Sequence, residues 1–264
     1  GAKMRDTQFN QKTGRDANSD NLRLGFSYTE PISRDKIWEL HYAYSKNSTG
    51  SENTIMDFNL GTAMYDLFNG ELSNHFENYN KYHQAGTNLR VVRKKYNFQV
   101  GGSLQHTYLE SNNLSKNTLV NQTFTNVLTN ASFNYNFRSS KNFSFNYRGR
   151  TNQPNLNQLQ PQRNISNAPN YYEGNPGLKQ EFINSFSMNY RHFNLMKMQN
   201  VFATISFTTI KDKIVNNVTF LGFGSQLTRP VNADGAYFIN SNIKYGIPIP
   251  GIKGSNFNAT TTVN

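Results

Sequence analysis

Cysteine is absent from the 264 residues, tryptophan occurs once, and apolar runs are short, such as Ile247–Pro250. Without cysteine, disulfide frameworks and cysteine-ligated metal sites are excluded. A transmembrane helix needs about 20 consecutive apolar residues, and no stretch of this sequence approaches that length. A membrane protein built from helices is therefore excluded as well.

The apolar material that is present consists largely of aromatic rings. Hydrophobic residues make up 36% of the chain and aromatic residues 14%, while the mean hydropathy is −0.72. A transmembrane β-barrel tolerates such polarity because only every second residue of a strand faces lipid, whereas the others face a wet lumen. Aromatic girdles at the two membrane interfaces of a barrel would also account for the rings.

Basic residues outnumber acidic ones, 27 to 16, and the formal net charge is +11. The cations form short clusters rather than one stripe: Arg34 with Lys36, Arg93–Lys95, and Arg138 with Lys141. Nucleic-acid binding is therefore not expected. At the rim of a barrel, such cations could meet the anionic headgroups of outer-membrane lipid.

Apolar and polar residues alternate along most of the chain. Between Val127 and Arg138 the odd positions are mainly apolar and the even positions almost all polar, which is the period of a strand with one apolar face. The same period predicts about ten strands, each near the roughly 9–11 residues with which a tilted strand crosses a bilayer. They are expected at residues 22–29, 38–45, 85–91, 98–104, 127–138, 143–148, 182–191, 201–208, 237–245 and 257–263.

The connections between these strands alternate between short and long. Outer-membrane barrels have this asymmetry, with short periplasmic turns and long external loops. The expected fold is therefore all-β, an antiparallel transmembrane β-barrel wall in the bacterial outer membrane; a soluble sandwich is the alternative. Residues 55–67 could form a short surface helix or extend the flanking strands. Short connections are expected near 30–35, 93–96, 138–142, 192–197 and 248–254, and long ones near 46–81, 110–124, 152–180 and 211–235.

One segment carries a more specific pattern. Arg150–Pro154 (RTNQP) is followed by Gln158–Pro161 (QLQP) and by Glu173–Glu181 (EGNPGLKQE). This resembles the R-x-x-x-Pro, QL-x-Pro and GNP-x-LKPE stretch of TonB-dependent outer-membrane receptors, especially the Bacteroidetes-type outer-membrane β-barrel family, although Gln180 stands where that family usually has proline. The residues that carry the resemblance are Gln158, Leu159, Pro161, Gly174, Asn175, Pro176, Leu178, Lys179 and Glu181.

The same segment also has a plain backbone interpretation. Pro154 and Pro161 cannot donate to a strand ladder, so they end the preceding strand. Asn175–Gly177 favours a turn that relaunches the chain, and Glu181 opens the next strand. We expect these residues to shape the loop rather than to touch a ligand, because turn residues usually act on backbone geometry.

The resemblance implies transport. Such receptors are 22-stranded barrels with an N-terminal plug that the TonB complex pulls, and they take up a scarce solute such as a siderophore, an oligosaccharide or a peptide. A surface lipoprotein is a further possible partner, and no cofactor is implied. Residues 1–264 contain no plug-like stretch or TonB box, they end on Asn264 rather than on an aromatic residue, and ten strands are too few to close that barrel. One domain, a partial barrel, is expected.

Motifs for nucleotide binding, zinc proteases and serine hydrolases are not found. His75 and His83 share a predicted long loop with Glu71 and Glu77, but loops rarely supply the geometry of a metal site, so we expect a solvated loop and no metal. A set of lumen-facing cations could attract an anionic solute or pair with acidic plug residues, and both readings stay open. These cations are Arg148, Arg150, Arg191 and Lys244.

Three functions remain to be weighed. The first is transport, as part of a TonB-dependent receptor wall. The second is catalysis, because a complete ten-stranded barrel could be an outer-membrane hydrolase. That reading needs Asp and His groups at one rim, where no motif joins the available Asp57, Asp66, His75 and His83. The third is a structural or adhesive barrel. We expect transport and no enzymatic activity.

Overall fold

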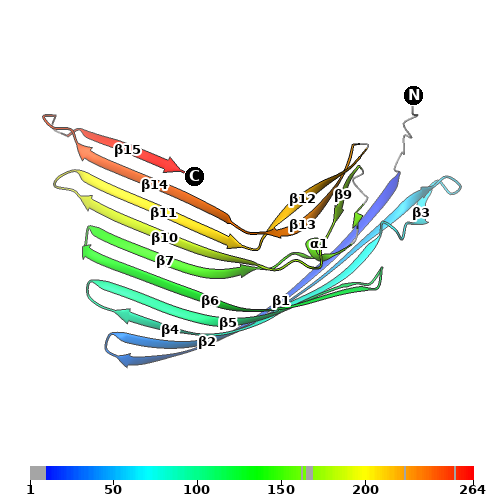
Figure 1. Cartoon of the computed structure of the whole chain (residues 1–264), viewed down its shortest axis with the longest axis horizontal. Helices are drawn as coiled ribbons and strands as arrows, with labels where there is room; N and C mark the ends of the chain where they lie inside the picture. The colour runs from blue at the N-terminus through cyan, green and yellow to red at the C-terminus, as the bar shows by residue number, and fades with distance from the viewer. Residues whose placement is uncertain (1–9, 162, 165–168, 223, 253) are drawn as a thin grey trace.

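A computed structural model describes residues 10–161, 163–164, 169–222, 224–252 and 254–264 (Figure 1). Within that part of the chain, no helix has the length and apolarity needed to cross a membrane. The elements are β1 (Gln11–Ser33), β2 (Lys36–Asn59), β3 (Met64–Phe68), β4 (Asn74–Val92), β5 (Tyr96–Asn113), β6 (Thr118–Arg138), β7 (Lys141–Asn152), α1 (Leu156–Leu159), β8 (Arg163–Asn164), β9 (Asn170–Glu173), β10 (Glu181–Asn194), β11 (Gln199–Lys211), β12 (Lys213–Gly222), β13 (Ser225–Ala233), β14 (Ala236–Pro248) and β15 (Asn256–Val263).

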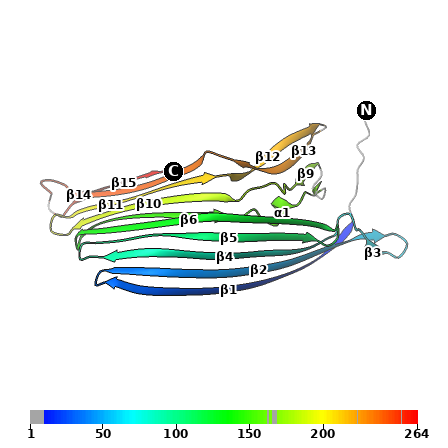
Figure 2. The same cartoon turned by 60° about the horizontal axis from the view of Figure 1, so that its bottom comes forward.

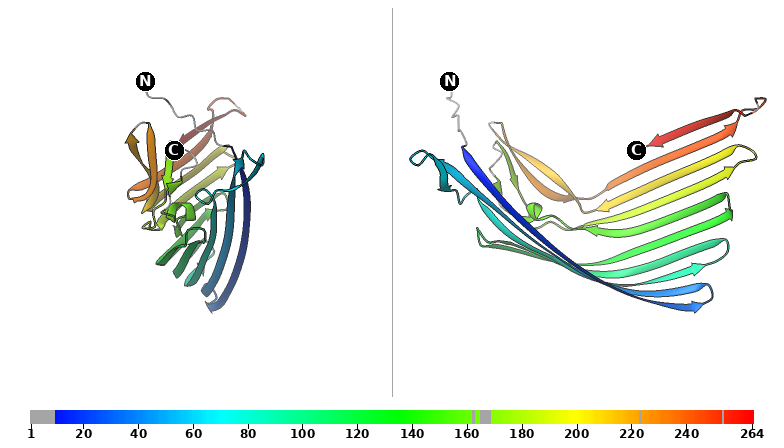
Figure 3. Two further views of the ribbon diagram at one scale, coloured as in Figure 1. Left: turned by 90° about the vertical axis from the view of Figure 1, so that its right-hand side faces the viewer. Right: turned by 180° about the vertical axis from the view of Figure 1, so that it is seen from behind.

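One large antiparallel sheet dominates the described residues. Its strands follow the order β1-β2-β4-β5-β6-β7-β10-β11-β14-β15, and β3 pairs with β2 outside this path. The ten strands predicted from alternation are all confirmed. The sheet curves into an open trough whose edges are β1 and β15 (Figures 1 and 3). A second sheet, ordered β12-β13-β9-β8, stands at one end of it.

The outer face of the trough is apolar from edge to edge. Directly opposed residues of neighbouring strands share a face, and Val100 on β5 lies opposite Leu89 on β4 and Ala131 on β6. Large side chains on this face are open to the surroundings, with Phe26 69% and Val127 63% exposed. Such a surface is unfavourable in water and is stable against lipid.

The inner face of the trough is polar and is crossed by hydrogen bonds between side-chain amides. The Asn134 amide donates to Asn97 Oδ1 over 3.0 Å. Asn130 donates to Asn88 Oδ1 over 3.2 Å, and Asn88 donates in turn to a Glu39 carboxylate oxygen over 3.3 Å. The wall is therefore a single layer with one face for lipid and one for a polar lumen.

Several strands are much longer than the alternation predicted. β1, β2, β4, β5 and β6 have 23, 24, 19, 18 and 21 residues. The expected long loops at 46–81, 110–124 and 211–235 were wrong: all three are mostly strand, and β5 and β6 are joined by residues 114–117 alone. Residues 55–67 extend β2 and form part of β3 rather than a helix. Beyond the bilayer both faces meet water, so the ladder continues while the apolar alternation stops.

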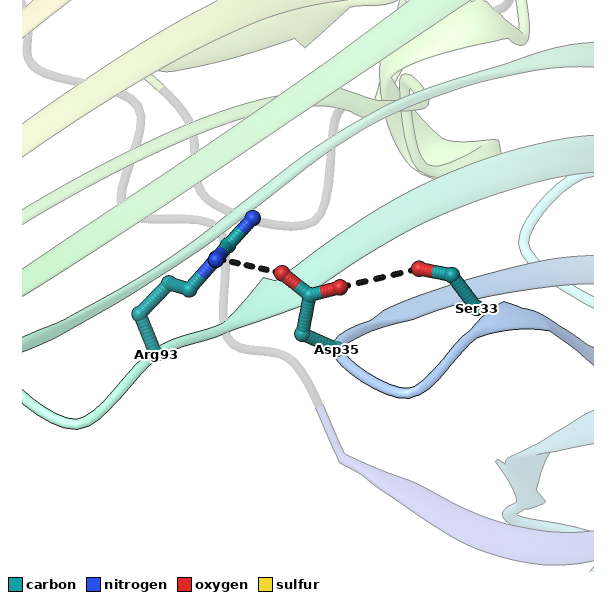
Figure 4. Close-up of polar contacts among 3 residues, drawn as sticks. All are labelled: Ser33, Asp35 and Arg93. Carbon is teal, nitrogen blue, oxygen red and sulfur yellow. Dashed lines mark hydrogen bonds and ion pairs between the residues drawn. The ribbon is translucent and has the colours of Figure 1, made fainter.

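The short connections are confirmed, and they lie at one end of the trough (Figure 2). Backbone hydrogen bonds join neighbouring turns, for example from Val92 N to Asp35 O over 2.8 Å. Asp35 also forms an ion pair with Arg93 and accepts a hydrogen bond from the Ser33 hydroxyl over 2.9 Å (Figure 4). The Ser33 hydroxyl lowers the pKa of Asp35 below 3.8; partial desolvation opposes this, and the Arg93 guanidinium adds to it.

The assignment of the two faces can be tested with two neighbouring residues of β6. Ala131→Arg would place a guanidinium on the apolar face and should lower the free energy of unfolding in lipid vesicles by roughly 2–4 kcal/mol. Ser132→Arg would place it on the polar face and should cost about 0.5 kcal/mol or less. Denaturant titrations of the full-length protein that contains residues 1–264, refolded in vesicles, measure both values. Equal losses would contradict the assignment of the faces.

The turn ion pair predicts a pH dependence. A carboxyl whose folded pKa is depressed stabilises the fold above its unfolded pKa and loses that contribution as the pH falls through the folded value. Asp35→Asn should therefore unfold at a lower temperature than the wild type at neutral pH, and the gap should close once the pH is well below 3.8. Asp20→Asn, on exposed β1, is the control. A difference in unfolding temperature that stays constant from neutral to acid pH would show that ionised Asp35 does not stabilise the turn.

Candidate functional site

The connection between β7 and β10 folds back over the inner face of the long strands. Leu159 of α1 and Leu178, 2% and 1% exposed, are among the largest fully buried side chains. Gln122 of β6 fixes the connection to the wall, because its amide nitrogen donates to Pro176 O over 2.5 Å and to Leu178 O over 3.1 Å. The apolar residues of the connection thus cover a part of the polar inner face that would otherwise face the open lumen.

Asn175 organises the turn at the centre of the sequence motif. Its backbone N donates to Gln158 O over 2.6 Å, its Oδ1 accepts from Gly177 N over 3.0 Å, and its Nδ2 donates to Pro230 O over 3.1 Å. Gly174 passes so close to α1 that a Cβ would collide with the Gln160 carbonyl. The motif therefore ties three separate segments together.

Two further contacts anchor the end of the motif. The Asn232 side chain accepts from Lys179 N over 2.8 Å and donates to Lys179 O over 3.0 Å. The Glu181 carboxylate, buried at the start of β10, accepts from Asn152 Nδ2 over 2.7 Å and from Ile214 N over 2.8 Å. These contacts support a loop-shaping role for the motif, which stays a prediction because no ligand contact tests it.

A cavity of about 170 Å³ lies between this connection and the inner face of β2, β4, β5 and β6. Three amide oxygens on its lining are buried without a described hydrogen-bond partner: Asn47 Oδ1, Asn80 Oδ1 and Gln122 Oε1. The orientation of Gln122 is fixed because its nitrogen donates to two carbonyls. Its free atom is thus an acceptor, and a bound molecule with hydroxyl or N–H donors would satisfy it.

A second cavity of about 350 Å³ continues the first one toward the loop end and shares Ser111 and Val120 with it. Its lining includes Pro161 and two cations, Lys116 and Arg163. Arg163 forms an exposed ion pair of 3.5 Å with Glu173. The described lining of the first cavity includes one carboxylate, Glu110, and no cation, whereas the second cavity is basic.

The four lumen-facing cations all lie on the polar face and are exposed, but the structure does not bring them together. Arg148 and Arg150 lie on β7 near the folded connection. Arg191 lies opposite Asn142, six residues from Arg148 along β7, which is about 20 Å at the rise of a strand. Lys244 lies opposite Phe202, and Phe202 lies opposite Arg191, so Lys244 is two strands away from Arg191. No ion pair of these four is found among the described residues.

The histidines predicted in a long loop are on β4 instead. His75 is the second residue of that strand, and His83 lies eight residues further along it, where its Nδ1 is 2.7 Å from the Tyr42 hydroxyl. Asp57 accepts from the side chains of Gln11 and Asn69. Within the described ranges, no group of three His, Cys, Asp or Glu residues is placed to hold a metal ion.

Sequence reasoning missed the residues that line the first cavity. Asn47 and Asn80 stood in an expected loop, and Gln122 in another. Only the strand register shows that Asn47 lies opposite Asn80, that Asn80 lies opposite Leu109, and that Leu109 lies opposite Gln122. No local signal marks them, because asparagine and glutamine are common throughout this sequence.

The chain matches one family model along its length, that of the outer membrane protein beta-barrel family, over residues 2–264. No curated protein sequence matches it. Among solved structures it is similar to the copper transporter OprC, with a TM-score of 0.65, 12% identity and 90% of this chain covered. It is also similar to the ferric citrate transporter FecA, with a TM-score of 0.56, 10% identity and 90% of this chain covered. For the alcaligin outer-membrane receptor FauA from Bordetella pertussis, the TM-score is 0.52, the identity 13% and the coverage of this chain 96%.

These structural likenesses concern the fold, because the identities are low. The chain spans 36%, 33% and 40% of the lengths of the three chains it resembles. Its ten-stranded trough therefore corresponds to a sector of their barrels.

The anchoring of the motif loop is testable through Asn232. Asn232→Ala removes the paired hydrogen bonds to Lys179 and a third one to Asp212 O, and it should release the connection, because each such hydrogen bond contributes about 0.5–1.5 kcal/mol. Amide exchange of residues 170–180 should accelerate about tenfold or more, while exchange in β4–β6 stays unchanged. Asn217→Ala, on an exposed position of the neighbouring β12, is the control. Unchanged exchange in the loop would contradict this anchoring.

Proposed function

The chain belongs to the outer membrane protein beta-barrel family, and we propose that it is a sector of the wall of a TonB-dependent receptor that imports a scarce solute. Family membership places it in the bacterial outer membrane. The transport role is supported by the motif resemblance at residues 150–181 and by a fold shared with proteins described as transporters and receptors. The plug and the TonB contact would be supplied by parts of the receptor outside residues 1–264.

The open sheet is the observation that carries the sector proposal. β1 and β15 are edges of the large sheet, and each presents unpaired backbone N–H and C=O groups along one side. Lipid offers no partners for these groups, so open sheet edges do not occur within the hydrocarbon of a bilayer. Further strands that pair with both edges would satisfy them, and a barrel of 22 strands fits the family resemblance.

The first cavity supports a solute that offers hydrogen-bond donors. Its unpartnered acceptors, on Asn47, Asn80 and Gln122, would receive hydroxyl or amide N–H groups. The described lining has no cation and includes the carboxylate Glu110, so it gives no attraction for a carboxylate or a phosphate. Among siderophores, oligosaccharides and peptides, the uncharged and donor-rich members therefore suit this cavity best, whereas an anionic chelate would be drawn to Arg148 and Arg150.

A hydrolytic role has less support. Asp57 and Asp66 accept hydrogen bonds from nearby side chains in the loop region, and His83 is engaged with Tyr42 on the outer face. General acid–base chemistry requires such groups to reach one substrate within about 3 Å. Asp57 on β2 and Asp66 on β3 are hydrogen-bonded to other side chains rather than to His83 on β4. In a purely structural barrel, the buried acceptors of the cavity would be left to water alone.

Closure of the barrel tests the sector proposal. Residues 1–264, refolded alone in detergent, should fail to give the heat-modifiable electrophoretic shift of a closed barrel, because two edges remain open. The receptor that contains this sequence should give the shift. A stable, heat-modifiable barrel formed by residues 1–264 as a monomer would overturn the proposal.

Solute contact at the cavity is tested with two inner-face substitutions. In the receptor, Asn47→Leu combined with Asn80→Leu should weaken binding of a neutral oligosaccharide or peptide by about tenfold or more, since a donor left without its acceptor costs at least about 1 kcal/mol. Asn112→Leu, on the outer face of β5, is the matched control. Calorimetry against a panel of solutes measures the change. If every solute that binds the wild type binds the double variant equally well, the cavity is not the solute site.

A further inference from the structure

Eight of the 27 cations of this protein lie at the tight turns. Each turn segment at 34–36, 93–95, 138–141 and 194–198 carries at least one, and the acid in these described segments is Asp35, which is already paired with Arg93. We call this group the turn rim. Its members are Arg34, Lys36, Arg93, Lys94, Lys95, Arg138, Lys141 and Lys197.

The opposite end of the wall has no comparable surplus of positive charge, because acids and cations both occur there. Apart from Glu30, Asp35 and Glu39, the acids on described residues lie toward the loop end of the strands. The net charge of +11 is therefore not spread over the molecule. Its larger part, +7 from the eight cations of the turn rim and Asp35, lies where short turns place the chain at the periplasmic surface of the membrane.

Lys36 and Lys141 of the turn rim face outward. Lys36 lies opposite Val91, which shares the outer face with Phe98. Lys141 lies two residues before Phe143, so both project to the same side of β7. The two ammonium groups thus stand on the lipid side of the wall, immediately beyond its last apolar residues.

Aromatic rings fix the level of Lys141. Its Nζ lies 4.8 Å from the centre of the Phe137 ring and 5.9 Å from that of Tyr190. Phe137 is packed edge-on against Tyr135 at 4.6 Å. Aromatic side chains at the ends of membrane strands mark the boundary between hydrocarbon and headgroups. An ammonium held above them lies at the depth of the lipid phosphates.

We propose that the turn rim is a binding band for anionic phospholipid headgroups of the periplasmic leaflet, with Lys36 and Lys141 as outward-facing anchors. Charge complementarity and depth both favour this partner. A basic residue near an anionic membrane surface attracts lipid with about 1 kcal/mol, so several neighbouring cations enrich phosphatidylglycerol-type lipid strongly. A soluble acidic partner would approach the turns from the periplasm, and it would not need cations on the lipid-facing side of the wall.

The single tryptophan of the sequence provides the probe. Trp38 lies on the outer face of β2, two residues from Lys36. The receptor is reconstituted in phosphatidylcholine vesicles that contain brominated phosphatidylglycerol or brominated phosphatidylcholine, and the signal of Trp38 is taken as the difference from Trp38→Phe. Brominated phosphatidylglycerol should quench Trp38 at severalfold lower mole fraction, and this preference should shrink at high salt, which screens exposed charges.

Charge removal then tests the assignment. Lys36→Gln with Lys94→Gln should reduce the preference for phosphatidylglycerol by about fivefold for each cation, whereas the Arg versions of both should retain it. Lys116→Gln, a cation at the loop end, is the control and should leave the preference unchanged. Lys141→Gln should reduce the amount of phosphatidylglycerol that copurifies with the receptor, as counted by native mass spectrometry.

Three results would overturn the proposal. One is equal quenching by the two brominated lipids in the wild type. Another is a preference that survives loss of both Lys36 and Lys94 in protein that retains the heat-modifiable shift. The third is loss of the preference when soluble polyglutamate is added at matched ionic strength, because that outcome would assign the turn rim to an acidic periplasmic partner. None of these experiments depends on which solute the receptor imports.

Discussion

Every backbone N–H and C=O group that enters lipid must find a partner within the protein, because hydrocarbon supplies none. The rest of this structure depends on that constraint. The ten-stranded ladder satisfies it strand by strand, and it does so without help from side chains. The side chains are then free to sort between two environments, with rings and aliphatic groups on one face and amides and hydroxyls on the other. Under the same constraint, the free edges of β1 and β15 require further strands to pair with them.

A wall of this kind has little need of an internal core. Lipid takes the place of packed side chains on the outer face, and water or ligand does so on the inner face. Deep burial arises mainly where the connection after β7 lies on the wall, at Leu159 and Leu178. There apolar contacts, the Gln122 amide and the turn around Asn175 hold one another in place. The first cavity forms at this junction, since a folded connection cannot fill the polar inner face completely.

The two ends of the wall are specialised in opposite ways. The loop end has long strands, a folded connection and cavities lined by polar groups, and there we place solute contact. The turn end has short connections, aromatic rings and a concentration of positive charge, and there we place contact with lipid. Long-range attraction is weak in salt beyond about 10 Å, so the two ends act independently. In the receptor that we propose, this separation would let a neutral solute bind despite a net charge of +11.

The sequence by itself determined the strands within the membrane, their faces and their turns. The alternation from Val127 to Arg138 sufficed, because it records which side chains meet lipid and which meet water. It could not reveal that β2 continues to Asn59, since outside the bilayer both faces are wet and the pattern ends before the ladder does. Only the tertiary structure decided the cavity. Asn47, Asn80 and Gln122 are far apart in the chain, and hydrogen-bond register across three strand pairs brings them to one place. Register is a property of paired strands, so no single stretch of sequence encodes it.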